Sequence, residues 1–281
     1  MVLRSYLGGS ERSDSQNYVD GKLLVLKKDN LKVINEYPED IKLIEAKICG
    51  NNLIVSGLQG FNIYDISKPE ELKIVYKYRQ KKFTEFQSFD VIEHNSKDYI
   101  VFARFAEGIS VWDITNPTQT KEVMTIPIQQ VTCNGEFLPK GLQCFSVMYK
   151  KPYVYATLAP MEMFFNTKND RRGIITYDFS NIDSVKQTAV LVPKCKWYNK
   201  KVGDPQPSYM DIYKNKLYVN FGEKGIAVFD ISNPNTPHYD CIMSICDGNL
   251  IQPIHINDRG ILFAGDYYWS NVYTKKINTS N

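Results

Sequence analysis

The amino-acid sequence predicts an all-β fold, a single five-bladed β-propeller. The main observation is a stretch that occurs four times among 281 residues, at Gly60–Pro69, Gly108–Pro117, Gly173–Asn181 and Gly225–Pro234. Each copy has a glycine, an apolar run closed by an aspartate, and a turn with Ser or Thr; we call it the marker stretch. Its aspartates are 48, 65 and 52 residues apart. Repeats of about 50 residues with strand-like units are typical of propeller blades or solenoids.

Each marker stretch is preceded by two shorter apolar runs and followed by one. In the last copy these runs are Tyr209–Tyr213, Lys216–Asn220 and Tyr239–Ser244. Short runs rich in β-branched and aromatic residues, separated by Asn, Gly, Lys and Asp, predict an antiparallel meander. No stretch has a helical period over about 11 residues. Four strands per repeat therefore make one blade.

The two ends of the chain complete the count of blades. Gly21–Lys27 and Leu31–Tyr37 match the marker stretch and the strand after it, whereas Ile251–Ile256 and Gly260–Ala264 match the first two strands of a blade. Two strands from each terminus make one more blade, and pairing them closes the ring so that few sheet edges stay exposed. The sequence therefore predicts five blades, the last closed by strands from both termini.

The marker stretches resemble the LVIVD-repeat family, whose repeats have a glycine, an aliphatic run, Asp-Ile/Val-Ser and a turn with proline. Four copies match well, and the fifth, at Gly21, matches loosely because Lys27-Lys28-Asp29 replaces Asp-Ile-Ser. The resemblance implies a propeller fold. The family has little assigned chemistry, so no catalytic residue is implied.

The predicted organisation is an N-terminal extension (residues 1–20), the propeller (21–266) and a C-terminal extension (267–281). One face of the propeller is expected to carry both extensions and three long loops, at residues 129–141, 158–172 and 194–207. We call it the loop-rich face. Long loops on a rigid scaffold are where binding residues usually lie. Any function is therefore expected on this face and around the central axis.

The four marker aspartates, Asp65, Asp113, Asp178 and Asp230, are expected to be structural. A carboxylate at a strand end accepts hydrogen bonds from backbone N–H groups of the following turn. A catalytic residue has no need to recur in every blade.

Non-repeating polar and aromatic residues are the candidates for ligand binding. Three glutamines begin innermost strands, an arginine and a glutamate follow a second strand, and three aromatic residues lie in irregular segments. Trp and Tyr in loops suit sugar stacking or a protein hot spot. Alternatively, the amides satisfy one another or trapped water, and the rings anchor loops to the rim. The candidates are Gln87, Gln143, Gln252, Arg104, Glu107, Trp197, Tyr267 and Trp269.

Four residues are candidates for catalysis if the protein is an enzyme: Asp90, Asp211, His255 and Asp266. Glycosidases place two carboxylates about 5–10 Å apart, and any two carboxylates near the axis could meet that distance. The alternative for the aspartates is ion pairing with Lys47 or Arg104. The alternative for His255 is a hydrogen-bonded core residue.

Composition excludes several other classes of function. The net charge of +3 lacks the concentrated basic face that nucleic-acid binding needs. Neither a signal peptide nor an apolar run of about 20 residues is present, so no membrane association is expected and a cytoplasmic location is predicted. The six cysteines have no Cys-x-x-Cys spacing and are expected to be free thiols.

Cofactor and metal sites are not expected either. No Gly-rich nucleotide motif or Gly-x-Ser-x-Gly elbow occurs. The three histidines, His94, His238 and His255, lie at positions that cannot converge on a transition metal. The sequence therefore favours a binding propeller with a protein or saccharide ligand at the loop-rich face and axial funnel. The alternative is a carbohydrate-active hydrolase or lyase.

Overall fold

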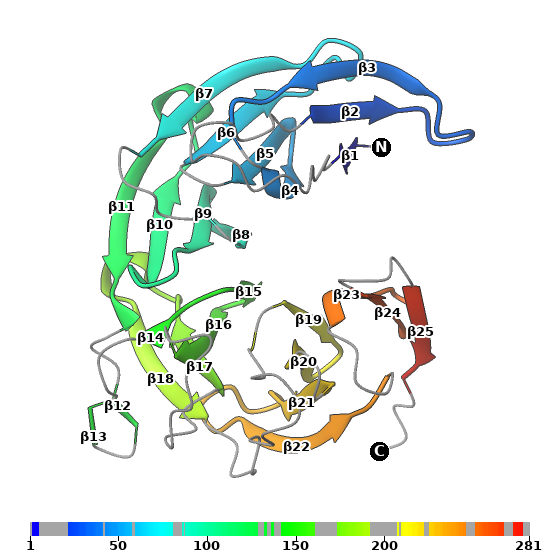
Figure 1. Cartoon of the computed structure of the whole chain (residues 1–281). Helices are drawn as coiled ribbons and strands as arrows, with labels where there is room; N and C mark the ends of the chain where they lie inside the picture. The colour runs from blue at the N-terminus through cyan, green and yellow to red at the C-terminus, as the bar shows by residue number, and fades with distance from the viewer. Residues whose placement is uncertain are drawn as a thin grey trace, which may run out of the picture. The chain divides into compact units, whose positions relative to one another are not determined.

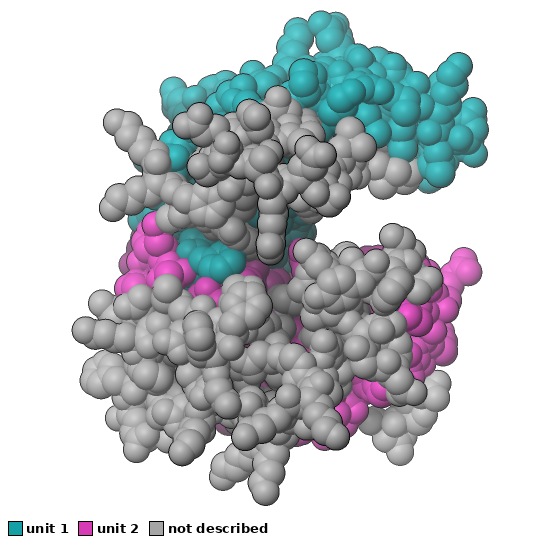
Figure 2. Space-filling view, viewed as in Figure 1, with its two compact units in different colours: residues 1–105, 110–124 teal, residues 106–109, 125–281 magenta. Residues whose placement is uncertain are grey.

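The computed structural model describes most of the chain as two compact units. Residues 1–105 and 110–124 belong to unit 1, and residues 106–109 and 125–281 belong to unit 2 (Figure 2). The described residues are 2–5, 22–41, 43–57, 60–80, 86, 88–128, 132–133, 136–137, 142–160, 173–191, 207, 209–221, 225–245, 251–266 and 272–277.

The described chain is all-β and has the predicted five-bladed β-propeller arrangement. Each complete blade is an antiparallel meander, and its first strand in sequence lies at one edge of the sheet (Figure 1). Two short 3₁₀ helices, η1 (Pro117–Gln119) and η3 (Ile182–Ser184), follow marker stretches. Among the described residues, no helix is long and apolar enough to cross a membrane.

Unit 1 holds a three-stranded N-terminal sheet and the first two blades. The N-terminal sheet consists of β1 (Val2–Ser5), β2 (Lys22–Leu26) and β3 (Val33–Pro38). The first blade consists of β4 (Leu43–Cys49), β5 (Asn52–Gly57), β6 (Gly60–Asp65) and β7 (Lys73–Arg79). The second consists of β8 (Phe89–His94), β9 (Lys97–Ala103), β10 (Ile109–Asp113) and β11 (Lys121–Ile126).

Unit 2 holds the third and fourth blades, a three-stranded C-terminal sheet and the short hairpin β12 (Thr132–Cys133) to β13 (Glu136–Phe137). The third blade consists of β14 (Leu142–Gln143), β15 (Val147–Lys150), β16 (Tyr153–Pro160), β17 (Gly173–Asp178) and β18 (Lys186–Leu191). The fourth consists of β19 (Met210–Tyr213), β20 (Lys216–Asn220), β21 (Ile226–Asp230) and β22 (His238–Met243). The C-terminal sheet consists of β23 (Ile251–Ile256), β24 (Ile261–Asp266) and β25 (Val272–Lys276).

The predicted closure by strands from both termini is not confirmed. The strands themselves form where they were expected, as β2, β3, β23 and β24. However, β24 lies between β23 and β25, and β2 lies between β1 and β3. Both edges of β2 and of β24 are therefore occupied. The additional strands β1 and β25 lie within the segments predicted as terminal extensions.

The glycine that opens the marker stretch lets the fourth strand of a blade pass close to the third. A Cβ atom at Gly225 would lie 2.5 Å from the Met243 carbonyl oxygen, and its φ of +101° is in the region that favours glycine. Gly60 and Gly108 meet the backbone of Tyr78 and Ile126 in the same way. The recurring glycine is thus a steric requirement of blade packing.

The predicted turn role of the marker aspartates is confirmed. In each of four turns, the Oδ1 atom of the aspartate accepts a hydrogen bond of 2.8–2.9 Å from the backbone N–H two residues later, at Ser67, Thr115, Ser180 and Ser232. Hydrogen bonds from the side chain and backbone of Ser180 lower the pKa of Asp178. These carboxylates favour their ionised form because they hold turns.

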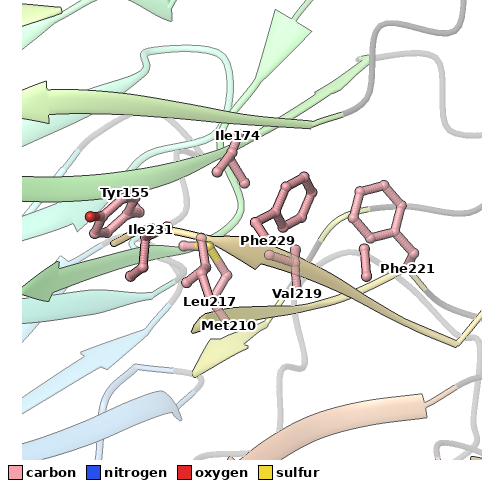
Figure 3. Packing of buried hydrophobic residues seen from close by; sticks show 9 residues of the cluster. Tyr155, Ile174, Met210, Leu217, Val219, Phe221, Phe229 and Ile231 are labelled. Atoms are coloured by element: carbon pink, nitrogen blue, oxygen red, sulfur yellow. The ribbon is translucent and has the colours of Figure 1, made fainter. Parts of the chain in front are cut away.

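Buried apolar clusters join neighbouring blades within each unit. In unit 2, Tyr155 and Ile174 of the third blade pack against Met210, Leu217 and Phe229 of the fourth (Figure 3). Because successive side chains of a strand point to opposite faces, each strand provides apolar side chains to both faces of its blade. Burying a large apolar side chain stabilises the fold by roughly 1.5–3 kcal/mol. These clusters hold the inner strands that carry the candidate residues.

Candidate functional site

Asp90 lies in an ion-pair cluster between the first strands of the first two blades. The Lys47 ammonium donates to the Asp90 carboxylate at 3.2 Å and to the Phe89 carbonyl oxygen at 2.5 Å, and lies 3.3 Å from Glu45. Burial lowers the pKa of Lys47, but the charges of Glu45 and Asp90 outweigh burial and raise it. The ion pair with Lys47, which was the alternative to a catalytic role for Asp90, is therefore present.

Asp211 lies on the first strand of the fourth blade and faces the C-terminal sheet. Its Oδ1 atom accepts the N–H of Ile212 at 2.7 Å, and its Oδ2 atom accepts the N–H of Ile256 at 2.6 Å. The His255 Nδ1 atom is 3.1 Å from Oδ2. The His255 side chain is 71% exposed, so its interpretation as a core residue is wrong, although its hydrogen-bonding contact is present.

Glu45, next to Asp90, and Asp211 form the same kind of hydrogen bond between neighbouring sheets. The Glu45 carboxylate accepts the N–H of Phe89 at 2.9 Å, as the Asp211 carboxylate accepts the N–H of Ile256. In both cases, a carboxylate on the first strand of one sheet satisfies a backbone donor on the first strand of the next. Buried backbone donors require such partners. These carboxylates therefore link adjacent sheets through hydrogen bonds between side chain and backbone.

Arg104, a candidate for ligand binding, is buried within the second blade. Its side chain is 4% exposed, donates to the Gln80 side-chain oxygen at 2.5 Å, and lies over the Phe86 ring at 4.5 Å. Its guanidinium is 3.9 Å from the Glu122 carboxylate. These contacts favour a structural role for Arg104. Glu107 is half-buried in the turn that follows.

The remaining candidates are only partly described. Gln143 is buried on β14. The backbones of Gln252 and Asp266 lie in β23 and β24, but their side chains lie outside the described residues. Gln87, Trp197, Tyr267 and Trp269 also lie outside the described residues. Asp90 and Arg104 belong to unit 1, whereas Glu107, Asp211, His255 and Gln143 belong to unit 2. The common site predicted for these residues stays a prediction.

The described residues of unit 2 form a pocket that was not expected from the sequence. Its volume is about 810 Å³, within the usual range for small-molecule sites. It lies between β22 and β25 and reaches the β19–β20 turn. It is lined by Tyr213, Lys214, Asn215, Lys216, Tyr218, Val228, Asp230, Ser232, Asp240, Cys241, Ile242, Met243, Ser244, Lys275, Lys276 and Ile277. We call it the β22–β25 pocket.

One wall of the β22–β25 pocket carries an ion-pair cluster. The Lys216 ammonium lies 2.6 Å from both Asp230 and Asp240, and His238 Nε2 lies 3.2 Å from Asp240. Hydrogen bonds to Asp230 and Asp240 raise the pKa of Lys216. A signal for this cluster was available, because the strand register places Lys216 directly opposite Asp230.

Three residues of the same cluster carry side chains that can ligate a metal ion. One ligand atom from each of Asp230, His238 and Asp240 lies within 4.8 Å of the others. However, the Lys216 ammonium already lies 2.6 Å from both carboxylates and occupies the position between them. The geometry is therefore that of a lysine-centred ion-pair cluster, and no metal is assigned to it.

Comparisons with known proteins agree with this fold. Residues 210–242 match the family model of the LVIVD repeat, which confirms the resemblance at the fourth blade. No curated protein matches the chain. A crystal structure of a protein from Lactobacillus plantarum is similar, with a TM-score of 0.67, 10% identity, and coverage of 99% of this chain and 78% of the other. A functionally unknown protein from Desulfotomaculum acetoxidans DSM 771 gives a TM-score of 0.58, 11% identity, and coverage of 92% and 75%. At these identities the likeness shows the fold alone.

Proposed function

We propose that this protein is a binding propeller that holds a ligand in the β22–β25 pocket and uses neither Asp90 nor Asp211 for catalysis. The observation that carries the proposal is the pocket itself. It combines apolar side chains, such as Val228 and Met243, with a few polar groups on its wall. This combination is typical of small-molecule sites.

The engagement of Asp90 and Asp211 supports a role without catalysis by these residues. A general acid or base must reach the substrate proton with its carboxylate. Asp211 is instead bonded to two backbone N–H groups, and Asp90 to Lys47. Releasing either carboxylate would leave a backbone donor or an ammonium without its present partner.

A protein or saccharide partner at the loop-rich face belongs to the same class of function. That part of the proposal rests on Trp197, Tyr267 and Trp269, whose aromatic rings suit stacking on a sugar or anchoring a protein. Because these residues lie outside the described residues, the β22–β25 pocket is proposed as the first site to test.

The test uses phenylnaphthylamine, an uncharged apolar dye that fluoresces when shielded from water. Saturable binding is expected, and Cys241→Trp should weaken it about tenfold because Cys241 lies opposite Val228 on β22 and the new ring occupies the pocket. Cys241 is exposed on β22, so the substitution disturbs little of the core. Ile74, 44% exposed on β7 of the first blade, provides the matched control Ile74→Trp. Equal dye binding by all three proteins would overturn the proposed function.

A further inference from the structure

The β22–β25 pocket has an excess of positive charge. Four lysines (Lys214, Lys216, Lys275, Lys276) and two aspartates (Asp230, Asp240) line it, which gives a net charge of +2. Both aspartates contact the ammonium of Lys216. The two carboxylates are thus concentrated at one end of the wall.

Two of these lysines keep a charge that no described carboxylate balances. The Lys275 ammonium donates to the carbonyl oxygen of Ser244 at 3.0 Å, and Lys276 donates to that of Arg259. A neutral carbonyl satisfies one donor of an ammonium and leaves its full charge. Among the described residues, neither lysine forms an ion pair. Both side chains are exposed at the β25 side of the pocket.

A further lysine next to the pocket adds to this positive region. Lys150 donates to the Lys214 carbonyl oxygen at 2.5 Å and to the Asn215 side-chain oxygen at 2.9 Å, so it braces the turn that closes one end of the pocket. Burial, only partly offset by the charge of Asp230, lowers the pKa of Lys150. The β19–β20 turn and β25 therefore both contribute lysines to the pocket, and Lys150 lies next to that turn.

Apolar side chains line the rest of the pocket. Tyr218, Val228 and Ile277 belong to the buried cluster between the fourth blade and the C-terminal sheet, and Met243 packs against that cluster. A ligand that satisfies both surfaces needs an apolar body and an anionic head. A free metal cation does not fit, because the Lys216 ammonium already lies between the two carboxylates.

We infer that the β22–β25 pocket binds an amphiphilic organic anion. Its apolar body lies against Tyr218, Val228, Met243 and Ile277, and its carboxylate, sulfonate or phosphate lies at Lys275. Lys276, on the other face of β25, adds positive charge nearby. The inference rests on the proposed function and adds the chemical class of the ligand.

The experiment compares two dyes that share one apolar body. Anilinonaphthalene sulfonate carries an anionic group, and phenylnaphthylamine is its uncharged parent. At about 0.02 M salt the sulfonate is expected to bind about tenfold more tightly, and most of the difference should vanish at about 0.3 M salt, where screening is stronger. Replacing both lysines (Lys275→Gln with Lys276→Gln) should weaken sulfonate binding about fivefold and leave binding of the uncharged dye unchanged within about twofold.

Controls separate this inference from the proposed function. Lys186→Gln removes an exposed lysine on β18, outside the pocket, and should leave both affinities unchanged. If both dyes bind equally, or if the lysine changes weaken both dyes alike, the anion inference is overturned while the proposed function stands. If the uncharged dye binds but Cys241→Trp has no effect on it, the proposed function is overturned and the anion site with it.

Discussion

The Asp211 carboxylate accepts a hydrogen bond from the backbone N–H of Ile256 at 2.6 Å. It thereby joins the first strand of the fourth blade to the first strand of the C-terminal sheet. Because the same carboxylate also accepts the N–H of Ile212, it satisfies two backbone donors at once. A residue that the sequence nominated for catalysis thus has a structural role in unit 2.

Replacing Asp211 with alanine should destabilise the fold by about 1–3 kcal/mol, because the Ile256 N–H loses its partner in a buried position. Urea denaturation followed by tyrosine and tryptophan fluorescence measures the change. Asp211→Asn should cost less, since the amide oxygen still accepts one N–H. Asp258→Ala, at an exposed turn residue, is the control. An Asp211→Ala protein as stable as the parent would contradict a stabilising role for the hydrogen bond between Asp211 and Ile256.

Gly225→Ala should destabilise the protein by about 2 kcal/mol or more, because alanine is strained at positive φ and its Cβ would meet the Met243 carbonyl. Gly50→Ala is a matched control, since Gly50 also has positive φ (+54°) but has open space around its Cβ position. Thermal unfolding of the two variants separates the steric cost from the backbone cost. Equal losses would argue against the close approach of the fourth strand.

Glu39 gives the first blade a pH dependence of opposite sign to that of the marker aspartates. Burial, which outweighs hydrogen bonds from Tyr64 and Asn62, raises the pKa of Glu39 above its ordinary value of 4.5. A raised folded-state pKa means that its contribution to stability is complete below about pH 4.5 and is lost as the pH rises through the folded-state value. The free energy of unfolding of the parent, relative to Glu39→Gln, should therefore fall between about pH 4 and pH 8. A constant difference across that range would refute the prediction.

Comparison with the Gln variant isolates Glu39 from the other carboxylates. Asp65, Asp113, Asp178 and Asp230 have lowered pKa values, so their contributions are lost as the pH falls. Both proteins contain all four aspartates. Their contributions to the free energy of unfolding are therefore equal in the parent and in Glu39→Gln, and they cancel when the two values are subtracted.

The blades could be predicted from the sequence because their signals are local. The expected strand Lys216–Asn220 coincides with β20, since alternation and turn residues define it within a few positions. The role of Asp230 followed from its place at a strand end. The third blade departs from expectation, because the Thr157 hydroxyl accepts the N–H groups of Phe145 and Ser146 and separates β14 from β15.

Features that depend on distant segments could not be predicted in the same way. The strands β1 and β25 lie in stretches without the marker pattern, so the pairing of Val25 with Val2 or of Ala264 with Tyr273 left no local signal. The β22–β25 pocket brings together segments more than a blade apart in sequence. Only the pairing of Lys216 with Asp230 could have been anticipated, from the strand register.

The described cysteines should differ sharply in reactivity with a thiol reagent. Burial raises the pKa of Cys144 to about 12, so almost no thiolate forms, and the side chain is inaccessible. Cys241 is exposed on β22, where partial burial of its thiol and the charge of Asp240 raise its pKa but leave the side chain accessible to a reagent. Because the thiolate is the reactive form, Cys241→Ala should remove one thiol from the set that reacts in the native protein. Cys144→Ala should leave that set unchanged and remove one thiol only after denaturation; a loss in the native protein would show that the third blade opens.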